Sequence, residues 1–85
     1  MAIVFDPTKD AANIAKHGLS LARADDLQIL ARVVDDRYAE TRYRAYSLID
    51  GELYCLAYAR RGNDLRAISL RRAHLKEFRR HALRS

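Results

Sequence analysis

The sequence is poor in the residues that disulfide, metal and nucleotide sites require. Its one cysteine, Cys55, forms no internal disulfide and no cysteine-rich metal site, and it is expected to pack within the apolar stretch ELYCLAYA. Three glycines do not build a phosphate-binding glycine loop, which argues against nucleotide hydrolysis. Three scattered histidines lack zinc-site spacing, so we expect no metal and no other cofactor.

Long apolar runs are also missing. No run approaches the roughly 20 residues that cross a bilayer, and the start, MAIVFDPTKD, lacks the basic region and apolar core of a signal peptide. The apolar fraction of 49% is nevertheless ordinary for a folded chain. We therefore expect a single cytoplasmic domain over residues 1–85.

Acidic residues are scarce in the last third of the chain. Residues 60–85 hold nine lysines and arginines against Asp64 and Glu77, a balance of +7. Residues 1–59 hold seven basic and nine acidic residues, a balance of −2. This asymmetry is typical of a surface for a polyanion, although a basic face that only contacts water remains the alternative.

The first third predicts a strand and two helices. The run AIVF favours a short strand, after which Asp6 and Pro7 are typical of a helix start and Gly18 of its end. Ser20 can cap a second helix. The first helix is expected to bury one apolar face, made of Ala11, Ile14 and Ala15. The second has helically spaced apolar residues at Leu21, Ala24, Leu27, and Leu30 or Ala31.

The rest predicts strands and one further helix. Strands are expected at residues 32–36, in RYRAYSLI, ELYCLAYAR and LRAISL, with Asp50-Gly51 and RRGND as turns. The final segment, RRAHLKEFRRHALR, predicts a basic helix with a narrow apolar stripe of Ala73, Leu75, Phe78, Ala82 and Leu83. The order β-α-α-β-β-β-β-α indicates an α+β domain with a small antiparallel sheet, two N-terminal helices and a basic C-terminal helix.

Alternation along the strands assigns side chains to faces. Arg66, Ile68 and Leu70 are expected on one face of the last strand, with Ser69 on the other in a structural role. In ELYCLAYAR, Tyr54 and Tyr58 share a face with Leu56, while Cys55, Ala57 and Ala59 suit packing beneath a helix. The tyrosine face could stack bases, but a half-buried sheet surface or a protein interface explains it equally well, and we favour the interface.

Two histidine pairs have both a structural and a functional interpretation. Lys16 and His17 precede Gly18, where basic residues stabilise a helix C-terminus, yet an exposed histidine also exchanges protons near neutral pH. Glu77 and His81 lie four residues apart in the last helix. They form either a helix-stabilising pair or a carboxylate that orients an imidazole.

Taken in order, these residues resemble the BrnT family, toxins of type II toxin–antitoxin modules. The shared positions span almost the whole chain: Asp6, Lys9, Asn13, Lys16, His17, Gly18, Ser20 and Ala24, then Arg42, then Arg66, Ile68, Ser69, Arg71, Ala73 and Glu77. The chain departs from the family at Leu21, where an aromatic residue is common, and at His81, where a tyrosine is usual.

The resemblance implies a RelE-like fold, ribonuclease activity that arrests translation, and a BrnA-type antitoxin. Such an antitoxin has a ribbon-helix-helix DNA-binding half, so operator DNA is contacted only through it, and no membrane is involved. The antitoxin is expected to cover part of the basic edge or the tyrosine face. On this interpretation the polyanion is RNA.

The leading hypothesis is therefore a metal-independent endoribonuclease. Such cleavage needs proton transfer and cations around the phosphorane. We assign proton transfer to His17 or His81 with Glu77 orienting, phosphorane stabilisation to Lys16, Arg66 and Arg71, and RNA backbone binding to Arg72, Arg79 and Arg80. The bend at His17 must then lie close to the C-terminal arginines. The alternative is a non-catalytic basic module that binds nucleic acid or the ribosome.

Overall fold

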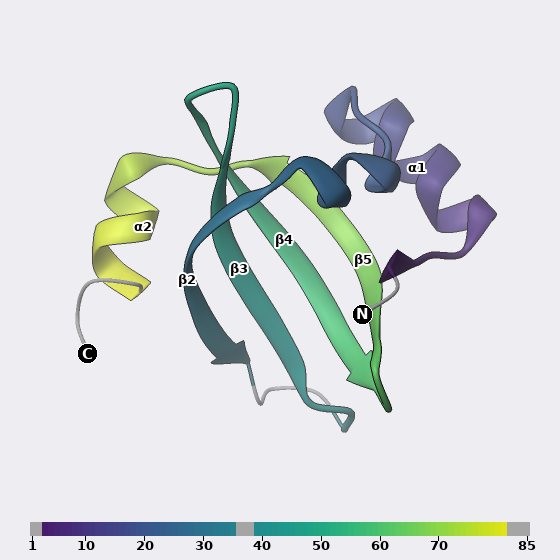
Figure 1. Cartoon of the computed structure of the whole chain (residues 1–85). Helices are drawn as coiled ribbons and strands as arrows, with labels where there is room; N and C mark the ends of the chain where they lie inside the picture. Colours follow the sequence, from purple (N-terminus) through teal and green to yellow (C-terminus); the bar gives the residue numbers. More distant parts are fainter. Residues whose placement is uncertain (1–2, 36–38, 82–85) are drawn as a thin grey trace.

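The computed structural model describes residues 3–35 and 39–81, which form one sheet flanked by helices (Figure 1). The expected order of strands and helices is found in these residues. The elements are β1 (Ile3–Val4), α1 (Pro7–His17), the 3-10 helix η1 (Leu21–Asp26), β2 (Gln28–Asp35), β3 (Arg42–Ile49), β4 (Glu52–Arg61), β5 (Asp64–Arg72) and α2 (Leu75–His81). Of the residues expected in the final helix and the first long strand, four lie outside the described ranges: Asp36, Ala82, Leu83 and Arg84.

The sheet is mixed, not purely antiparallel as expected. Its strand order is β1-β5-β4-β3-β2, and β1 runs parallel to β5 while the other pairs are antiparallel. The two predicted turns join adjacent antiparallel strands. Asp50 and Gly51 both have positive φ, 50° and 80°, and Gly62 opens the second turn with φ 59°. These backbone values match the right-handed twist of hairpins, which explains the Asp-Gly and Gly-Asn sequences.

The second helix is shorter than predicted. Ser20 does cap it, with Oγ accepting from the Ala22 amide at 3.1 Å, but the helix ends at Asp26. Residues 28–31, expected to continue the helix, belong to β2, which pairs with β3 from Gln28 onward. Backbone pairing with β3, followed by the β-branched run in the second half of β2, overrides the helical spacing of the leucines.

Helix α1 buries a polar residue instead of its expected apolar face. Ala11, Ile14 and Ala15 are exposed, and Ile14 retains 47% of its accessible surface, whereas Asn13 retains 5%. The Asn13 amide donates to the carbonyl of Leu70 at 3.0 Å and accepts from the Leu70 amide at 3.0 Å. Hydrogen bonds to the backbone of β5 therefore hold this helix in place of apolar packing.

A β-bulge in β5 changes the face assignment. Ala67 pairs with Tyr58 and Ser69 with Ala57, which leaves Ile68 as an extra residue. Leu70 consequently faces the same side as Leu65, and Ser69 the same side as Arg66, contrary to simple alternation.

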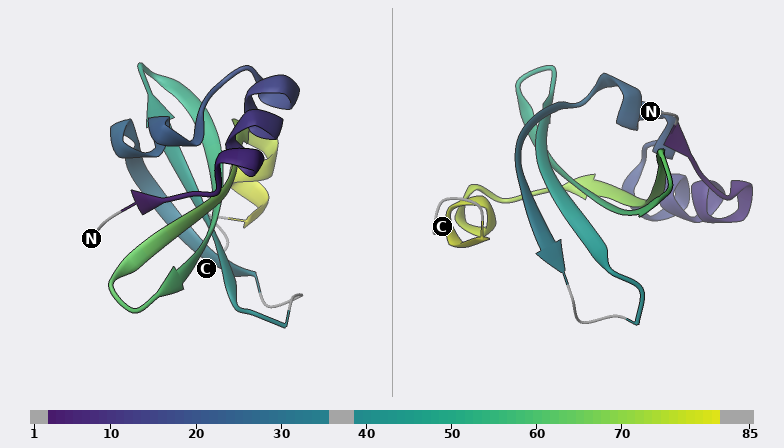
Figure 2. Two further views of the ribbon diagram at one scale, coloured as in Figure 1. Left: turned by 90° about the vertical axis from the view of Figure 1, so that its right-hand side faces the viewer. Right: turned by 60° about the horizontal axis from the view of Figure 1, so that its bottom comes forward.

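The tyrosine face of β4 is core, not an interface. Leu56 and Tyr58 are buried, and they belong to one cluster with Leu21 and Ala24 of η1. Tyr43 stacks on Tyr58 with ring centroids 5.3 Å apart. Figure 2 (left) shows η1 on one side of the sheet and both α1 and α2 on the other. The small-residue face of β4 is thus directed toward the side of α1 and α2.

Candidate functional site

One face of the sheet carries cationic side chains around a floor of small ones. The strand registers place three residues from each of three strands on this face, which we call the arginine face. They are Arg42, Arg44 and Tyr46 of β3, Cys55, Ala57 and Ala59 of β4, and Arg66, Ser69 and Arg71 of β5. Because the side chains of β4 are short, a hollow remains between the longer side chains of its two neighbours.

Two neighbouring cavities open on the arginine face. The α1 cavity, of about 410 Å³, is lined by Lys9, Ala12, Asn13, Lys16, His17, Ile68, Ser69 and Arg71. The β3 cavity, of about 170 Å³, is lined by Asp35, Arg42, Tyr43, Arg44, Cys55, Ala57, Ser69 and Arg71. Ser69 and Arg71 line both, so the two cavities meet at these side chains.

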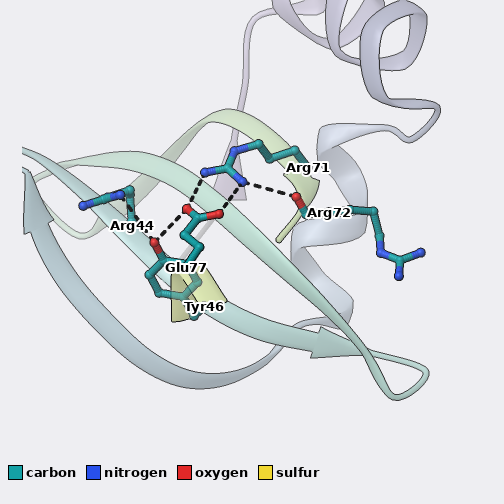
Figure 3. A network of polar contacts seen from close by, with 5 residues as sticks. All are labelled: Arg44, Tyr46, Arg71, Arg72 and Glu77. Carbon is teal, nitrogen blue, oxygen red and sulfur yellow. Dashed lines mark hydrogen bonds and ion pairs between the residues drawn. The ribbon is translucent and has the colours of Figure 1, made fainter. Parts of the chain in front are cut away.

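A chain of polar contacts crosses the arginine face to α2 (Figure 3). Arg71 donates to both carboxylate oxygens of Glu77, at 2.9 Å to Oε1 and 2.6 Å to Oε2. The Tyr46 hydroxyl donates to Glu77 Oε2 at 2.9 Å and accepts from Arg44 Nη1 at 3.3 Å. Arg71 Nη1 also donates to the Arg72 carbonyl at 3.2 Å. A bidentate arginine–carboxylate pair of this kind fixes both partners in orientation as well as in distance.

These contacts determine the protonation states at the site. The hydrogen bonds from Arg71, with a smaller contribution from Tyr46, lower the pKa of Glu77 to about 2, against the opposing effect of burial. Burial and the hydrogen bond to Glu77 raise the pKa of Tyr46, and burial raises the pKa of Cys55. The same bond to Glu77 raises the pKa of Arg71. At neutral pH, Glu77 is therefore a fixed anion, and the phenol and the thiol hold their protons.

Helix α2 is attached through two of its residues. Glu77 binds Arg71 and Tyr46, and Phe78 meets the Tyr46 ring edge-on with centroids 5.8 Å apart. None of the described residues of α2 is buried. The helix therefore depends on this one contact region for its position.

Helix α1 brings its C-terminal turn to the arginine face. Asn13 binds the backbone of Leu70, which lies between Ser69 and Arg71 in β5. Asp10 accepts from the Ser20 hydroxyl at 2.9 Å and from the Leu21 amide at 2.7 Å, which fixes the chain after the helix. Gly18, with φ 79°, ends the helix directly after Lys16 and His17. These bonds position Lys16 and His17 relative to Arg71.

The structure brings some of the predicted site residues together. Lys16, His17 and Arg71 line the α1 cavity, so the bend at His17 lies beside a C-terminal arginine. Arg66 lies on the arginine face by register but lines neither cavity. Glu77 is bound to Arg71 and Tyr46, and within the described chain it makes no hydrogen bond to His81.

The other predicted residues lie apart from the α1 cavity. Arg80 and His81 line a third hollow of about 490 Å³ on α2, with His74, Lys76 and Glu77. Arg79 is exposed on the same helix. Arg72 points away from the network (Figure 3), because its guanidinium binds Glu52 at 2.6 Å and lies 5.6 Å from the centre of the Tyr54 ring.

Sequence reasoning missed two side chains of the arginine face. Arg44 lines the β3 cavity, and Tyr46 joins Arg44 to Glu77 of α2. Lys9, which lines the α1 cavity, and Arg42 had been noted only through the family resemblance. The alternation Arg42-x-Arg44-x-Tyr46 would have placed these three on one face, but nothing local indicates that α2 covers that face.

In residues 3–35 and 39–81, no group of three or more histidine, cysteine or acidic residues could hold a metal ion. No helix in the same ranges is long and apolar enough to cross a membrane.

Comparisons with known proteins agree with the resemblance seen in the sequence. Residues 5–77 match the family model described as the ribonuclease toxin BrnT of type II toxin–antitoxin systems. The structure is similar to the 1.1 Å crystal structure of the Brucella abortus ribonuclease toxin BrnT, with a TM-score of 0.69 and 31% identity over 87% of this chain and 97% of that one. A search of curated proteins gave no match.

Proposed function

The chain belongs to the BrnT family of ribonuclease toxins of type II toxin–antitoxin systems, and from this premise we propose that it cleaves RNA in the cytoplasm without a bound metal ion and arrests translation. The observation that carries the proposal is the α1 cavity, where His17 and Lys16 from α1 lie beside Arg71 from β5. An imidazole beside two fixed cations is a suitable set for metal-independent phosphodiester cleavage.

Each residue then has a defined part in the reaction. His17 takes the proton of the ribose 2′-hydroxyl, whose oxygen attacks the adjacent phosphorus. Lys16 and Arg71 stabilise the negative charge of the phosphorane, and Arg66 adds to the positive potential of the same face. The 5′-oxygen of the next nucleotide leaves with a proton that water supplies, because His81 lies in the hollow on α2, apart from the α1 cavity. The products are a 2′,3′-cyclic phosphate and a 5′-hydroxyl.

Glu77 acts through Arg71 in this scheme. The bidentate contact at 2.9 and 2.6 Å fixes the guanidinium plane, and a carboxyl group with a pKa of about 2 cannot exchange protons at neutral pH. Glu77 is thus a positioning residue for Arg71, not the orienting partner of a histidine.

The donor set of the α1 cavity supports a reaction without a metal ion. Lys9, Lys16 and Arg71 give it positive charge, and the nearby carboxylate of Glu77 is bound by two guanidinium nitrogens. A divalent cation prefers several free oxygen ligands and is repelled by ammonium and guanidinium groups. A phosphodiester is attracted by the same groups.

The family membership implies an antitoxin partner, which we propose to be of the BrnA type. A ribbon-helix-helix half of that protein would contact operator DNA, so this chain would meet DNA only indirectly. Exposed arginines of α2, Arg79 and Arg80, would bind the RNA backbone next to the site. An antitoxin that covers the arginine face would inhibit by excluding RNA.

The test is cleavage of RNA by the purified protein in excess EDTA. We expect cleavage with 2′,3′-cyclic phosphate ends, reduced at least about 100-fold by His17→Ala, in the range of general acid–base contributions. Arg23→Gln is the matched control, because Arg23 pairs with Asp26 on η1, on the other side of the sheet. Cleavage that EDTA abolishes would exclude this mechanism. Salt-sensitive RNA binding without any cleavage would support the non-catalytic module instead.

A further inference from the structure

The β3 cavity has a charge distribution of its own. Three guanidinium groups line it, from Arg42, Arg44 and Arg71, together with the carboxylate of Asp35. Arg71 is already paired with Glu77, and Arg42 stands directly opposite Asp35 in the register of β2 and β3. Arg44 differs from both, because no carboxylate of the described chain lies within salt-bridge distance of it.

Arg44 has more hydrogen-bonding capacity than its surroundings use. Its Nη1 donates to the Tyr46 hydroxyl at 3.3 Å, and its Nε is buried without a hydrogen-bond acceptor in residues 3–35 and 39–81. The Tyr46 hydroxyl carries no charge at neutral pH, since its pKa is raised by burial and by Glu77. A half-buried cation with an unused donor is costly unless an anion approaches it.

The β3 cavity has the size and neighbours of a phosphate site. Its 170 Å³ equals roughly the liquid volume of five or six water molecules, which suits a tetrahedral oxyanion. Ser69, with a hydroxyl donor, lines it and also lines the α1 cavity, as does Arg71. An anion in each cavity would therefore lie on either side of the Arg71 guanidinium.

We propose that the β3 cavity binds a second phosphate, next to the one cleaved in the α1 cavity, so that the protein's substrate is an RNA segment with two consecutive phosphates. This inference rests on the proposed function for the order of the two phosphates. Arg44 is the group that the second phosphate pairs with, and Arg71 lies between the two. The carboxylate of Asp35 does not prevent binding, because Arg42 stands opposite it in the register, and Arg44 has no carboxylate of the described chain within salt-bridge distance.

The test is calorimetric binding of three ligands that the protein does not cleave: adenosine 3′,5′-bisphosphate, adenosine 3′-monophosphate and adenosine 5′-monophosphate. The bisphosphate presents two phosphates at the spacing of an RNA chain. We expect it to bind at least about tenfold more tightly than either monophosphate, in the range of one charge-assisted contact. Arg44→Gln should remove most of this advantage, and Arg44→Lys should keep part of it.

Two results would overturn the proposal. One is equal affinity of the wild-type protein for all three ligands, and the other is an equal loss for all three in Arg44→Gln, which would be an effect of net charge alone. Arg23→Gln carries the same change of charge and should keep the advantage. Thermal unfolding confirms that each variant is folded.

The outcome separates this inference from the proposed function. A protein that fails to cleave RNA but shows the Arg44-dependent advantage refutes the ribonuclease proposal and supports the second phosphate site. A protein that cleaves RNA in EDTA but binds the bisphosphate no more tightly than the monophosphates supports the ribonuclease proposal and refutes the second phosphate site.

Discussion

Glu77 is the residue through which α2, β3 and β5 meet. Its side chain retains 19% exposure and contacts Arg71 and Tyr46 at once. The pair with Arg71 is partly shielded from solvent and bidentate, so it is expected to matter more than an exposed surface pair.

The first prediction concerns pH. The pKa of Glu77 is about 2 in the folded protein against a usual 4.5, so its contribution to stability is complete above about pH 4.5 and is lost as pH falls towards 2. Glu77→Gln should lack this part of the acid dependence. Urea unfolding of both proteins at several pH values between 2 and 7 measures it. Parallel stability curves, with the same difference at every pH, would contradict the assigned pKa.

The second prediction concerns the Tyr46 hydroxyl. Tyr46→Phe keeps the ring against Phe78 but removes the donor to Glu77, and it should cost about 1–2 kcal/mol of unfolding free energy. It should also raise the pKa of Glu77, since that hydrogen bond lowers it. Tyr58→Phe is the control, because Tyr58 is equally buried but its hydroxyl makes no hydrogen bond in the described part of the chain. A larger loss for Tyr58→Phe would refute the assignment.

Among the elements, α1 has an unusual attachment that gives the third prediction. Asn13→Ala leaves the buried amide and carbonyl of Leu70 without their partner and should cost about 1–3 kcal/mol. It should also lower kcat/KM for RNA, because Lys16 and His17 lose their fixed position beside Arg71.

The neighbouring residue in the same helix is the control. Ile14→Ala should change stability by less than about 0.5 kcal/mol, because Ile14 is 47% exposed. Denaturant titration of both variants measures the free energy of unfolding. It shows whether α1 is held by the hydrogen bonds of Asn13 or by the apolar face that contains Ile14. If Ile14→Ala were the more costly change, the apolar face expected from the sequence would be the buried one.

The sequence predicts features of the helices and strands that depend on local residues, but not those that depend on distant strands. The caps at Asp6, Gly18 and Ser20 and the Asp50-Gly51 turn are local, since each depends on one residue's side chain or its φ angle, and the structure confirms all of them. The end of η1, the buried face of α1 and the bulge at Ile68 depend on pairing with distant strands. Local spacing does not contain that information.

The same distinction applies to the candidate site. Lys16, His17 and Arg71 were predicted from charge and from the family resemblance, and they line one cavity. Arg44 and Tyr46 were not, because their importance follows from the position of α2 over β3. The sequence pattern shows that they share a strand face but not what lies across from it.

For the whole molecule, the asymmetry of charge predicts how RNA binding depends on salt. Each lost phosphate contact to a single strand lowers the slope of log affinity against log salt concentration by about 0.7. We expect this reduction in Lys16→Gln and in Arg44→Gln, and no change in Arg23→Gln. Binding of a 2′-O-methyl RNA, which lacks the attacking hydroxyl, measures the slope without cleavage. An equal reduction in all three variants would mean a diffuse charge effect and no defined site.

The extra residue at Ile68 has a consequence for variation in chain length. In a regular strand, removal of one residue turns every later side chain to the opposite side. Removal of Ile68 at the bulge would not turn the later side chains. Ala67 and Ser69, on either side of it, already pair with the consecutive β4 residues Tyr58 and Ala57. A chain without this residue would keep Leu70 on the core side of the sheet and would keep Ser69 and Arg71 on the arginine face. Relatives that differ here by a single deletion are therefore expected to present the same recognition surface.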